Sequence, residues 1–368
     1  LIYTGHKFHG DPDDEANLYQ VQCLATSRDG IHFVRQGMIV DTPPGLHHFR
    51  DPKVWREGKS WYMVVGARDG ETGQVRVYRS ADLRQWQDMG VLAVAEKEMG
   101  YMWECPDFFM LNGKRVLMFS PQGMAAEGFK NRNLFQSGYL LGEWQPGQPF
   151  VREGEFVEMD RGHDFYAPQS FLTPDGRRIV IGWLDMWESS QPEQEDGWAG
   201  MLSLPRELTL SADNRLQMRP AREVEGLRRA WFPWPVSTLN NQQMALVERC
   251  DAMEVILQWD CANSSAEQYG MSLGEGLRVY VDAQMQRLVL ERNYPQYGLC
   301  GTRSIALNLD NTLNLRLFFD SSSVEVFVNE GDACLSSRIY PEAGRREINV
   351  FAWGGSALLF EAGAWQLE

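Results

Sequence analysis

Short runs of apolar residues, each bounded by turn residues, recur along the first half of the chain and predict β-strands. The segments 51–66, 105–120 and 167–183 share one pattern: a residue before proline, an apolar run, a glycine-containing turn and a second apolar run. Two of the turns are Asn112-Gly113 and Asp175-Gly176, which are strong hairpin signals because the favoured two-residue turn needs positive φ. The three segments therefore predict three hairpins related by an internal repeat.

A second repeated segment lies outside the hairpins. Residues 26–33 match residues 79–86, which suggests that further strands follow each hairpin. A four-stranded unit recurring in this way is typical of a propeller blade. A β-sandwich with accidental similarity between hairpins is the alternative, and the third occurrence in register counts against it.

The repeat aligns residues 1–5 with the second strand of a hairpin, so we expect the chain to start in the middle of a blade. Three blades and part of a fourth can be counted before about residue 210. We therefore predict an all-β protein in which residues 1–218 are the C-terminal part of a five-bladed β-propeller whose first part is missing from this chain.

The pattern changes after the repeats. Residues 219–235 are charged and proline-containing, and we interpret them as a linker with a short helix. Residues 254–259, 277–281 and 324–328 alternate between apolar and polar positions, as half-buried antiparallel strands do. Residues 236–368 are therefore predicted to form a β-sandwich.

Composition narrows the function classes. The net charge of -15 argues against a nucleic-acid partner, which needs clustered Lys and Arg. The chain has 13 Trp, and indole rings either fill β cores or stack on sugars. The sequence contains no run of about 20 apolar residues, so it predicts no membrane-spanning helix. The six Cys show no metal-ligand spacing, and the absence of paired cysteines favours the cytoplasm.

Two acids stand at the heads of predicted inner strands, and these ends should face one central funnel. Glycoside hydrolysis needs one carboxylic acid that protonates the leaving oxygen and a second carboxylate across the sugar. Glu104 follows Trp103 in apolar surroundings that would raise its pKa, so it is the candidate general acid/base. Asp51 follows Arg50, which would favour its ionised form and suit a carboxylate that stabilises the transition state.

Three more residues are candidates for substrate contact. Asp164 and Tyr166 precede the third inner strand at the equivalent point, and Trp183 ends the strand that follows. A single acid at such a position is more often a turn or cap residue that accepts backbone N–H groups. Recurrence in repeat register is what favours a carbohydrate site here.

The residues at these positions also resemble known motifs. Arg50-Asp51-Pro52 looks like the "RDP" motif and Glu104-Cys105-Pro106 like the "ECP" motif of glycoside hydrolase family 32, which includes invertases and sucrose hydrolases. Residues 320–327 are similar to the strand signature of that family's C-terminal sandwich. The resemblance implies a retaining β-fructofuranosidase with neither a metal nor an organic cofactor. It also implies that Arg50 and Asp51 bind fructose and that Glu104 is the acid/base.

One family motif is not found. The nucleophile of the family is the Asp of an "NDPNG" motif, and Asp11 in Asp11-Pro12-Asp13 is the nearest substitute. We reject Asp11 because it falls in a polar hairpin loop. The sequence therefore predicts that this chain lacks the nucleophile. We expect the 368-residue polypeptide to be inactive without upstream sequence.

Other functions stay open. A fructoside-binding module without turnover would use the same residues, and a related five-bladed hydrolase that inverts arabinosides or xylosides would share the propeller. The sequence does not distinguish sucrose from sucrose-6-phosphate as the substrate, and it leaves the oligomeric state undecided.

Overall fold

The computed structural model describes residues 1–96, 98–249, 251–342 and 346–368. These residues form β-strands joined by turns and five short 3₁₀ helices, Glu15–Asn17, Pro192–Asp196, Arg222–Leu227, Pro295–Tyr297 and Asn329–Gly331. They divide into two compact units. The first unit contains residues 1–125, 134–158 and 167–169, and the second contains residues 126–133, 159–166 and 170–368. None of the helices formed by the described residues has the length and apolar character that a membrane crossing requires.

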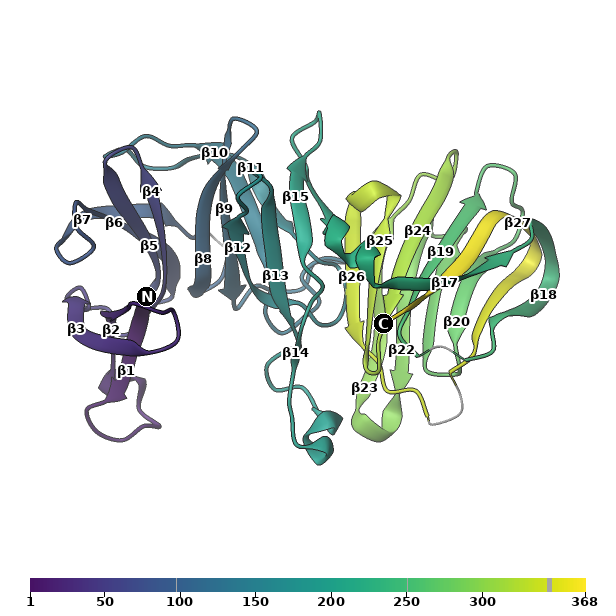
Figure 1. Ribbon diagram of the computed structural model, residues 1–368, viewed down its shortest axis with the longest axis horizontal. Coiled ribbons are helices and arrows are strands. Elements are labelled where there is room, and N and C mark those ends of the chain that lie inside the picture. Colours follow the sequence, from purple (N-terminus) through teal and green to yellow (C-terminus); the bar gives the residue numbers. More distant parts are fainter. Residues whose placement is uncertain (97, 250, 343–345) are drawn as a thin grey trace. The chain divides into compact units, whose positions relative to one another are not determined.

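The first unit contains three antiparallel sheets, each a meander of strands that are consecutive in the chain (Figure 1). The first sheet has three strands: β1 Ile2–Phe8, β2 Leu18–Ser27 and β3 Phe33–Val40. The second has four: β4 Phe49–Glu57, β5 Ser60–Asp69, β6 Thr72–Ser80 and β7 Trp86–Val94. The third has four: β8 Met102–Leu111, β9 Lys114–Gln122, β10 Gly138–Glu143 and β11 Val151–Glu158.

The predicted hairpins are confirmed. In β8–β9, Leu111 pairs with Lys114 across Asn112 and Gly113, whose φ angles are 46° and 84°. Both turn residues are thus left-handed, as a two-residue turn of this kind requires. The loop after β12 differs, because Gly176 N donates to Thr173 O and only Gly176 of the Asp-Gly pair has positive φ.

The repeated segments 26–33 and 79–86 form the turns between the last two strands of their sheets. In the first, Asp29 Oδ1 accepts hydrogen bonds from the N–H groups of residues 31 and 32. In the second, Asp82 Oδ1 accepts from the N–H groups of residues 84 and 85. The repeat therefore preserves an aspartate that satisfies the turn backbone.

The first strands of successive sheets contact one another through the side chains of the residues that follow the repeated prolines, Lys53, Asp107 and Gln169. Lys53 Nζ lies 3.1 Å from Asp107 Oδ2 and 3.1 Å from Gln169 Oε1. Gln169 Nε2 in turn donates to Cys105 O over 2.9 Å. Asp107 is 1% exposed, so these contacts are buried between β4, β8 and β12. The predicted convergence of the inner strands is confirmed.

The second unit begins with a fourth sheet of the same meander type. Its strands are β12 Tyr166–Leu172, β13 Arg178–Leu184, β14 Met201–Leu202, β15 Arg206–Leu210 and β16 Leu216–Pro220. Residues 167–169 of β12 group with the first unit. The described residues therefore form four blade-like sheets, the first of them with three strands, and five blades stay a prediction.

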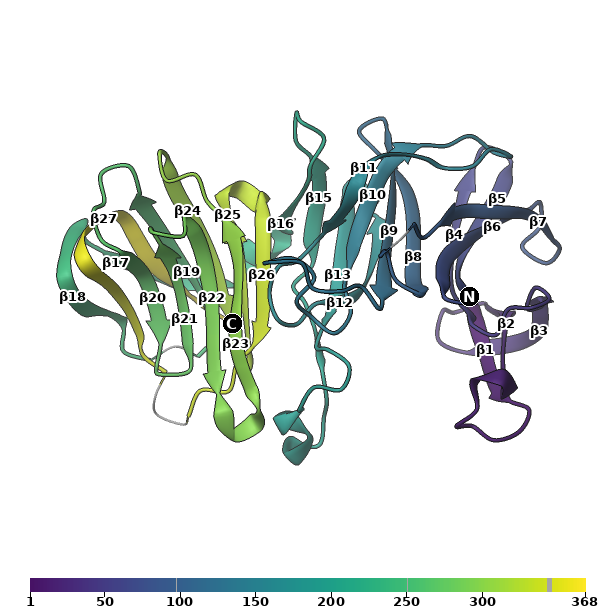
Figure 2. The same ribbon diagram turned by 180° about the vertical axis from the view of Figure 1, so that it is seen from behind.

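The rest of the second unit is one continuous sheet of eleven strands folded into two layers, which Figure 2 shows from behind. Its strands are β17 Arg228–Trp234, β18 Ser237–Val247, β19 Met253–Asp260, β20 Gln268–Leu273, β21 Leu277–Asp282, β22 Arg287–Tyr294, β23 Leu299–Ala306, β24 Thr312–Phe319, β25 Ser323–Val328, β26 Ala333–Arg338 and β27 Ile348–Leu367.

The long strand β27 joins the two layers. Residues 348–353 pair with β20, and residues 358–366 pair with β19. Between them Gly354 and Gly355 have φ angles of 71° and 148°, a conformation that other residues rarely adopt, so the strand can bend here. One apolar cluster with residues from both layers, including Val255, Leu290 and Val326, is fully buried between them. The predicted sandwich is confirmed at the level of a two-layer sheet.

The segment expected to be a linker has regular structure. Residues 222–227 form the predicted short helix as a 3₁₀ helix, and β17 pairs with β27 from Arg228 to Trp234. Residues 228–234 thus belong to the sandwich sheet. The linker over 219–235 and the domain limits at 218 and 236 stay predictions.

Candidate active site

A backbone irregularity recurs at the head of each inner strand in the first unit. The residues before the repeated prolines, Asp51, Cys105 and Ala167, have φ angles of 66°, 50° and 51°. Residues with a Cβ rarely adopt positive φ, and a following proline restricts them further. The pairing of β4 and of β8 shifts at the same points, between Arg50 and Lys53 in β4 and between Glu104 and Asp107 in β8. Strained bulges of this kind re-aim side chains and are common next to active sites.

Asp51, in the bulge of β4, is hydrogen-bonded to Cys105, in the bulge of β8. Asp51 Oδ2 accepts a hydrogen bond from Cys105 N over 2.9 Å and lies 3.6 Å from Cys105 Sγ. The N–H of Asp51 donates to Thr4 Oγ1 over 3.0 Å, which ties the bulge to β1. Burial raises the pKa of Asp51, although the Cys105 N–H and the Arg50 charge act in the opposite direction. Asp51 is therefore held in place by three strands and is partly desolvated.

Glu104 is held by side chains on two strands. Arg50 donates from Nε and Nη2 to Glu104 Oε1 over 2.9 and 2.7 Å. Gln122 Nε2, at the end of β9, donates to Glu104 Oε2 over 2.9 Å. The Glu104 side chain keeps 13% of its surface exposed, so a ligand can reach it. Both oxygens of this carboxylate are thus oriented while one edge stays accessible.

Arg50 is itself positioned by the first sheet. Its Nη1 donates to Gln20 Oε1 over 3.3 Å and lies 2.9 Å from His48 Nδ1. Gln20 is 2% exposed and also accepts from the N–H of Phe49. Burial and the charge of Arg50 lower the pKa of His48, which favours a neutral ring whose Nδ1 accepts a hydrogen bond from Arg50 Nη1. Arg50 therefore has a fixed direction toward Glu104.

One expectation about these groups is wrong. The Arg50 guanidinium contacts Glu104, and its charge acts to lower the pKa of Asp51, as the sequence predicts. Burial outweighs the Arg50 charge at Asp51, so the pKa of Asp51 is raised, whereas the sequence predicted a favoured ionised form. Glu104 was expected to lie in apolar surroundings. Its neighbour Trp103 is indeed 0% exposed, but the Glu104 carboxylate itself contacts polar groups.

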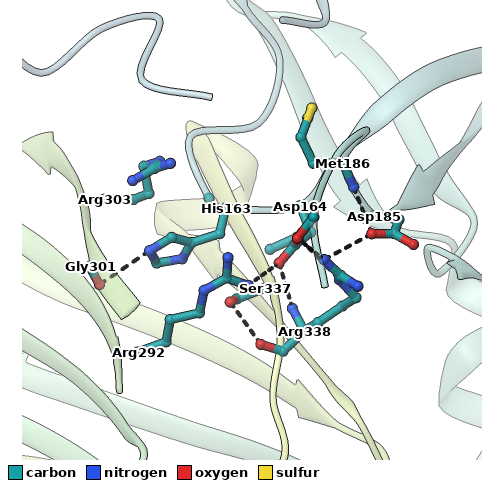
Figure 3. Close-up of polar contacts among 12 residues, drawn as sticks. His163, Asp164, Asp185, Met186, Arg292, Gly301, Arg303, Ser337 and Arg338 are labelled. Atoms are coloured by element: carbon teal, nitrogen blue, oxygen red, sulfur yellow. Dashed lines mark hydrogen bonds and ion pairs between the residues drawn. The ribbon is translucent and has the colours of Figure 1, made fainter. Parts of the chain in front are cut away.

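Asp164 lies in the second unit and has a different environment. Figure 3 shows its carboxylate between Arg292 and Arg338. Arg338 donates from Nε to Oδ1 over 3.1 Å and from its backbone N to Oδ2 over 2.8 Å, and Arg292 Nη1 donates to Oδ2 over 2.6 Å. Asp164 is 0% exposed. In the structure this buried carboxylate therefore binds the sandwich strands, and its predicted contact with substrate is not supported by its burial.

The aromatic candidates divide by exposure. Tyr166 is 2% exposed, so its predicted contact with substrate is not supported by its burial. Trp183 is half-buried, and its ring lies 5.6 Å from that of Trp187, which is 53% exposed. A sugar contact of Trp183 stays a prediction.

Asp11 is placed as the sequence predicts. It lies in the exposed turn between β1 and β2, and its Oδ1 accepts from Asp13 N over 3.0 Å. The residues that sequence reasoning missed are Gln20, Gln122 and Thr4. They lie on strands adjacent to the motif strands, and an amide or hydroxyl on a mostly buried strand is the signal that could have identified them.

The arrangement brings together two carboxyl groups with different partners. Asp51 binds the backbone of Cys105, and Glu104, the residue before Cys105, binds Arg50 and Gln122. Such a pair can hold a hydroxylated ligand on one group and exchange a proton through the other. Within the described ranges no group of His, Cys, Asp and Glu side chains is arranged to hold a metal ion.

Comparison with known proteins identifies the family of both parts of the chain. Residues 1–220 match the glycosyl hydrolases family 32 N-terminal domain, and residues 223–366 match the glycosyl hydrolases family 32 C-terminal domain. A sucrose-6-phosphate hydrolase of Escherichia coli is 53% identical over 368 residues, which cover 100% of this chain and 77% of that protein. A raffinose invertase of Escherichia coli is 52% identical with the same coverage of 100% and 77%.

Solved structures agree with these relatives. A GH32 β-fructofuranosidase of Bombyx mori superposes with a TM-score of 0.84 at 32% identity, covering 100% of this chain and 76% of that one. A variant of the same Bombyx mori enzyme in complex with sucrose gives the same values, 0.84 and 32%. The similarity extends over the whole of this chain in both comparisons.

Proposed function

Because the chain belongs to glycosyl hydrolase family 32, we propose that it acts as a β-fructofuranosidase that releases the terminal fructose of sucrose or sucrose-6-phosphate. The observation that carries this proposal is the coupling of the two bulges, in which Asp51 binds Cys105 N and Arg50 binds Glu104. The names of the two Escherichia coli relatives and the sucrose bound to the Bombyx mori enzyme support a sucrose-type substrate.

Glu104 is the proposed general acid/base. In the first step its protonated carboxyl donates to the glycosidic oxygen as the bond to fructose breaks, and the glucosyl part leaves as an alcohol. In the second step the carboxylate accepts a proton from the attacking water. Arg50 and Gln122 keep the group in one orientation for both steps, since they bind opposite oxygens.

Asp51 is the proposed binder of fructose hydroxyls and the stabiliser of the transition state. Its Oδ2 is occupied by Cys105 N, whereas Oδ1 has no hydrogen-bond partner among the residues that the structure describes. This free oxygen can accept a hydrogen bond from a sugar hydroxyl. When ionised, Asp51 also opposes the positive charge that develops on the fructosyl ring.

Retention of configuration by double displacement requires a nucleophilic carboxylate in addition to this pair. Asp107 is an unsuitable nucleophile because it is 1% exposed and paired with Lys53. Asp11 is unsuitable because it satisfies an exposed turn. Neither Asp107 nor Asp11 is therefore proposed as the nucleophile.

The experiment that tests the function compares the wild-type protein with its Glu104→Gln variant on sucrose and on sucrose-6-phosphate. Proton NMR of the first product identifies the anomer, and β-fructofuranose means retention. Glu57→Gln is a matched control, because Glu57 pairs with Arg115 at the far end of β4. If the wild-type protein binds sucrose but releases no fructose, the fructoside-binding alternative replaces the enzyme. Release of the inverted anomer contradicts double displacement.

A further inference from the structure

The outer face of one sandwich layer has an unusual composition. In β27 the residues Val350 and Ala352 point into the core between the layers, so Asn349, Phe351 and Trp353 face outward. These three residues line a groove of about 700 Å³, together with residues of β18, β20 and β21. An outward face is normally covered by polar side chains, whereas here aromatic rings form part of it.

The aromatic rings form a continuous row. The Phe351 and Trp353 rings are stacked, with centroids 6.1 Å apart and planes at 21°, and the Tyr280 ring lies 6.4 Å from Phe351. Gly270 lies opposite Phe351 and Tyr280 in the sheet, and a Cβ at this position would come within 2.8 Å of Tyr280 Cβ. The glycine therefore makes room for the row. Phe351 and Tyr280 are only 1% and 8% exposed, so Trp353, which ends the row and is 39% exposed, is the ring that a ligand can reach.

Polar groups flank this row within the groove. The Arg278 guanidinium lies 4.4 Å from the Tyr280 ring centre and 4.9 Å from that of Phe351. Asn349 and Ser272 face each other across β27 and β20 and are 5% and 7% exposed. Asn349 Nδ2 donates to Glu347, but the Ser272 hydroxyl has no hydrogen-bond partner within the described part of the chain. A hydroxyl that lines the groove is suited to a ligand with hydroxyl groups.

We propose that this groove is a second, non-catalytic binding site for a neutral oligosaccharide. An indole face next to hydroxyl and amide groups matches a sugar ring, which has an apolar face and a rim of hydroxyls. Three carboxylates, Glu248, Glu275 and Glu347, line the groove against the one guanidinium of Arg278, so an anionic ligand is repelled. The site would hold a longer carbohydrate on the sandwich independently of turnover, and it goes beyond the proposed function.

Native gels that contain inulin, levan or dextran test the site with the wild-type protein. We expect at least one polysaccharide to retard the wild-type protein and Trp353→Ala to weaken that binding about tenfold or more. Phe232→Ala is the control, because Phe232 is 49% exposed on β17 of the same sandwich and does not line the groove. Circular dichroism verifies that each variant is folded.

A second variant fills the groove instead of removing the ring. Gln243 lies opposite Phe351 across β18 and β27 and lines the groove, so Gln243→Arg should place a long side chain over the rings and also reduce retardation. Glu104→Gln should be retarded like the wild-type protein, which separates this site from the catalytic one. Absence of retardation by all three polysaccharides, or full retardation of Trp353→Ala, would overturn the proposal. Self-association that Trp353→Ala abolishes, without retardation, would overturn it in favour of a second copy of the chain.

Discussion

Glu104 and Asp164 both stand at the heads of inner strands, and comparing them separates position from role. Glu104 contacts one guanidinium and one amide and keeps 13% of its side chain exposed. Asp164 contacts two guanidinium groups and is 0% exposed. Glu104 lies within β8, two residues before Pro106, whereas Asp164 lies before β12, four residues before Pro168. Their partners differ as well, and these decide what each carboxylate can do. A carboxylate with an accessible edge can exchange a proton, whereas one enclosed by cations joins two layers.

The same contrast extends to the arginines. Arg50 links two inner strands at a half-buried site, while Arg338 and Arg206 are 0% exposed. Arg206 lies on β15 and binds Asp160 Oδ2 and Glu325 Oε2 over 2.9 and 2.6 Å. Buried ion pairs of this kind contribute more to specific packing than to stability, but breaking one leaves an uncompensated charge. The second unit therefore uses its charged pairs to fix the blade-like sheet against the sandwich.

The largest effect is expected at Glu104. Glu104→Gln should lower kcat for sucrose by about 10²–10⁴-fold, because general acid catalysis contributes that much. Sucrose binding should change little, since glutamine keeps an oxygen that can accept from Arg50, whereas loss of the ion pair with Arg50 should lower the melting temperature. Steady-state release of reducing sugar measures the change. A loss below tenfold would mean that another residue donates the proton.

The second test removes the carboxylate of Asp164, the buried residue of the two compared. Asp164→Ala should lower the free energy of unfolding by about 3–5 kcal/mol, because Arg292 and Arg338 lose their carboxylate in the interior. Urea unfolding at pH 7 measures it. Asp213→Ala is the control, because Asp213 pairs with Arg215 at the surface and exposed pairs contribute about 0–1 kcal/mol. If the folded Asp164→Ala variant instead lost kcat while keeping wild-type stability, Asp164 would return to the site.

A more conservative change tests the positioning of Glu104. Arg50→Lys keeps the charge but removes the fork that binds Glu104 through Nε and Nη2 and reaches Gln20 through Nη1. We expect kcat/KM to fall about tenfold and the pH profile to shift, since lysine would hold the carboxylate in a different geometry. Arg76→Lys is the control, as Arg76 pairs with Asp88 on the outer strands. An unchanged pH profile would contradict the positioning role.

The sequence predicted what is local and missed what is distant. Local features could be predicted because they depend on residues within a few positions of one another. These features are the hairpins, the aspartate turns and the heads of the inner strands. The partners of Asp164 are 128 and 174 residues away in the chain, and no periodicity points to them.

Glu325 illustrates the same limit. It lies in the predicted strand 324–328, where alternation suggested a half-buried strand, but every residue of β25 is buried. The second face of β25 packs on Arg206, whose guanidinium lies 5.3 Å from the Phe327 ring centre. The sign of φ at Asp51 was equally unreadable, because residues before proline normally adopt extended conformations, and this sign decides which side chain Arg50 reaches.

The smallest effect is expected in the pH dependence of the free energy of unfolding, to which the buried carboxyl group of Asp51 contributes. Burial raises its pKa in the folded protein, so the unfolded chain ionises at lower pH than the folded one. The contribution of this group to stability is therefore fully present below the unfolded pKa and is lost as pH rises through the folded pKa. Asparagine does not ionise. Asp51→Asn should then be more stable relative to the wild-type protein at pH 7 than at pH 4, although it loses activity. Urea unfolding at both pH values measures the difference, and a relative stability that falls toward pH 7 would show that the Cys105 N–H and Arg50 outweigh burial.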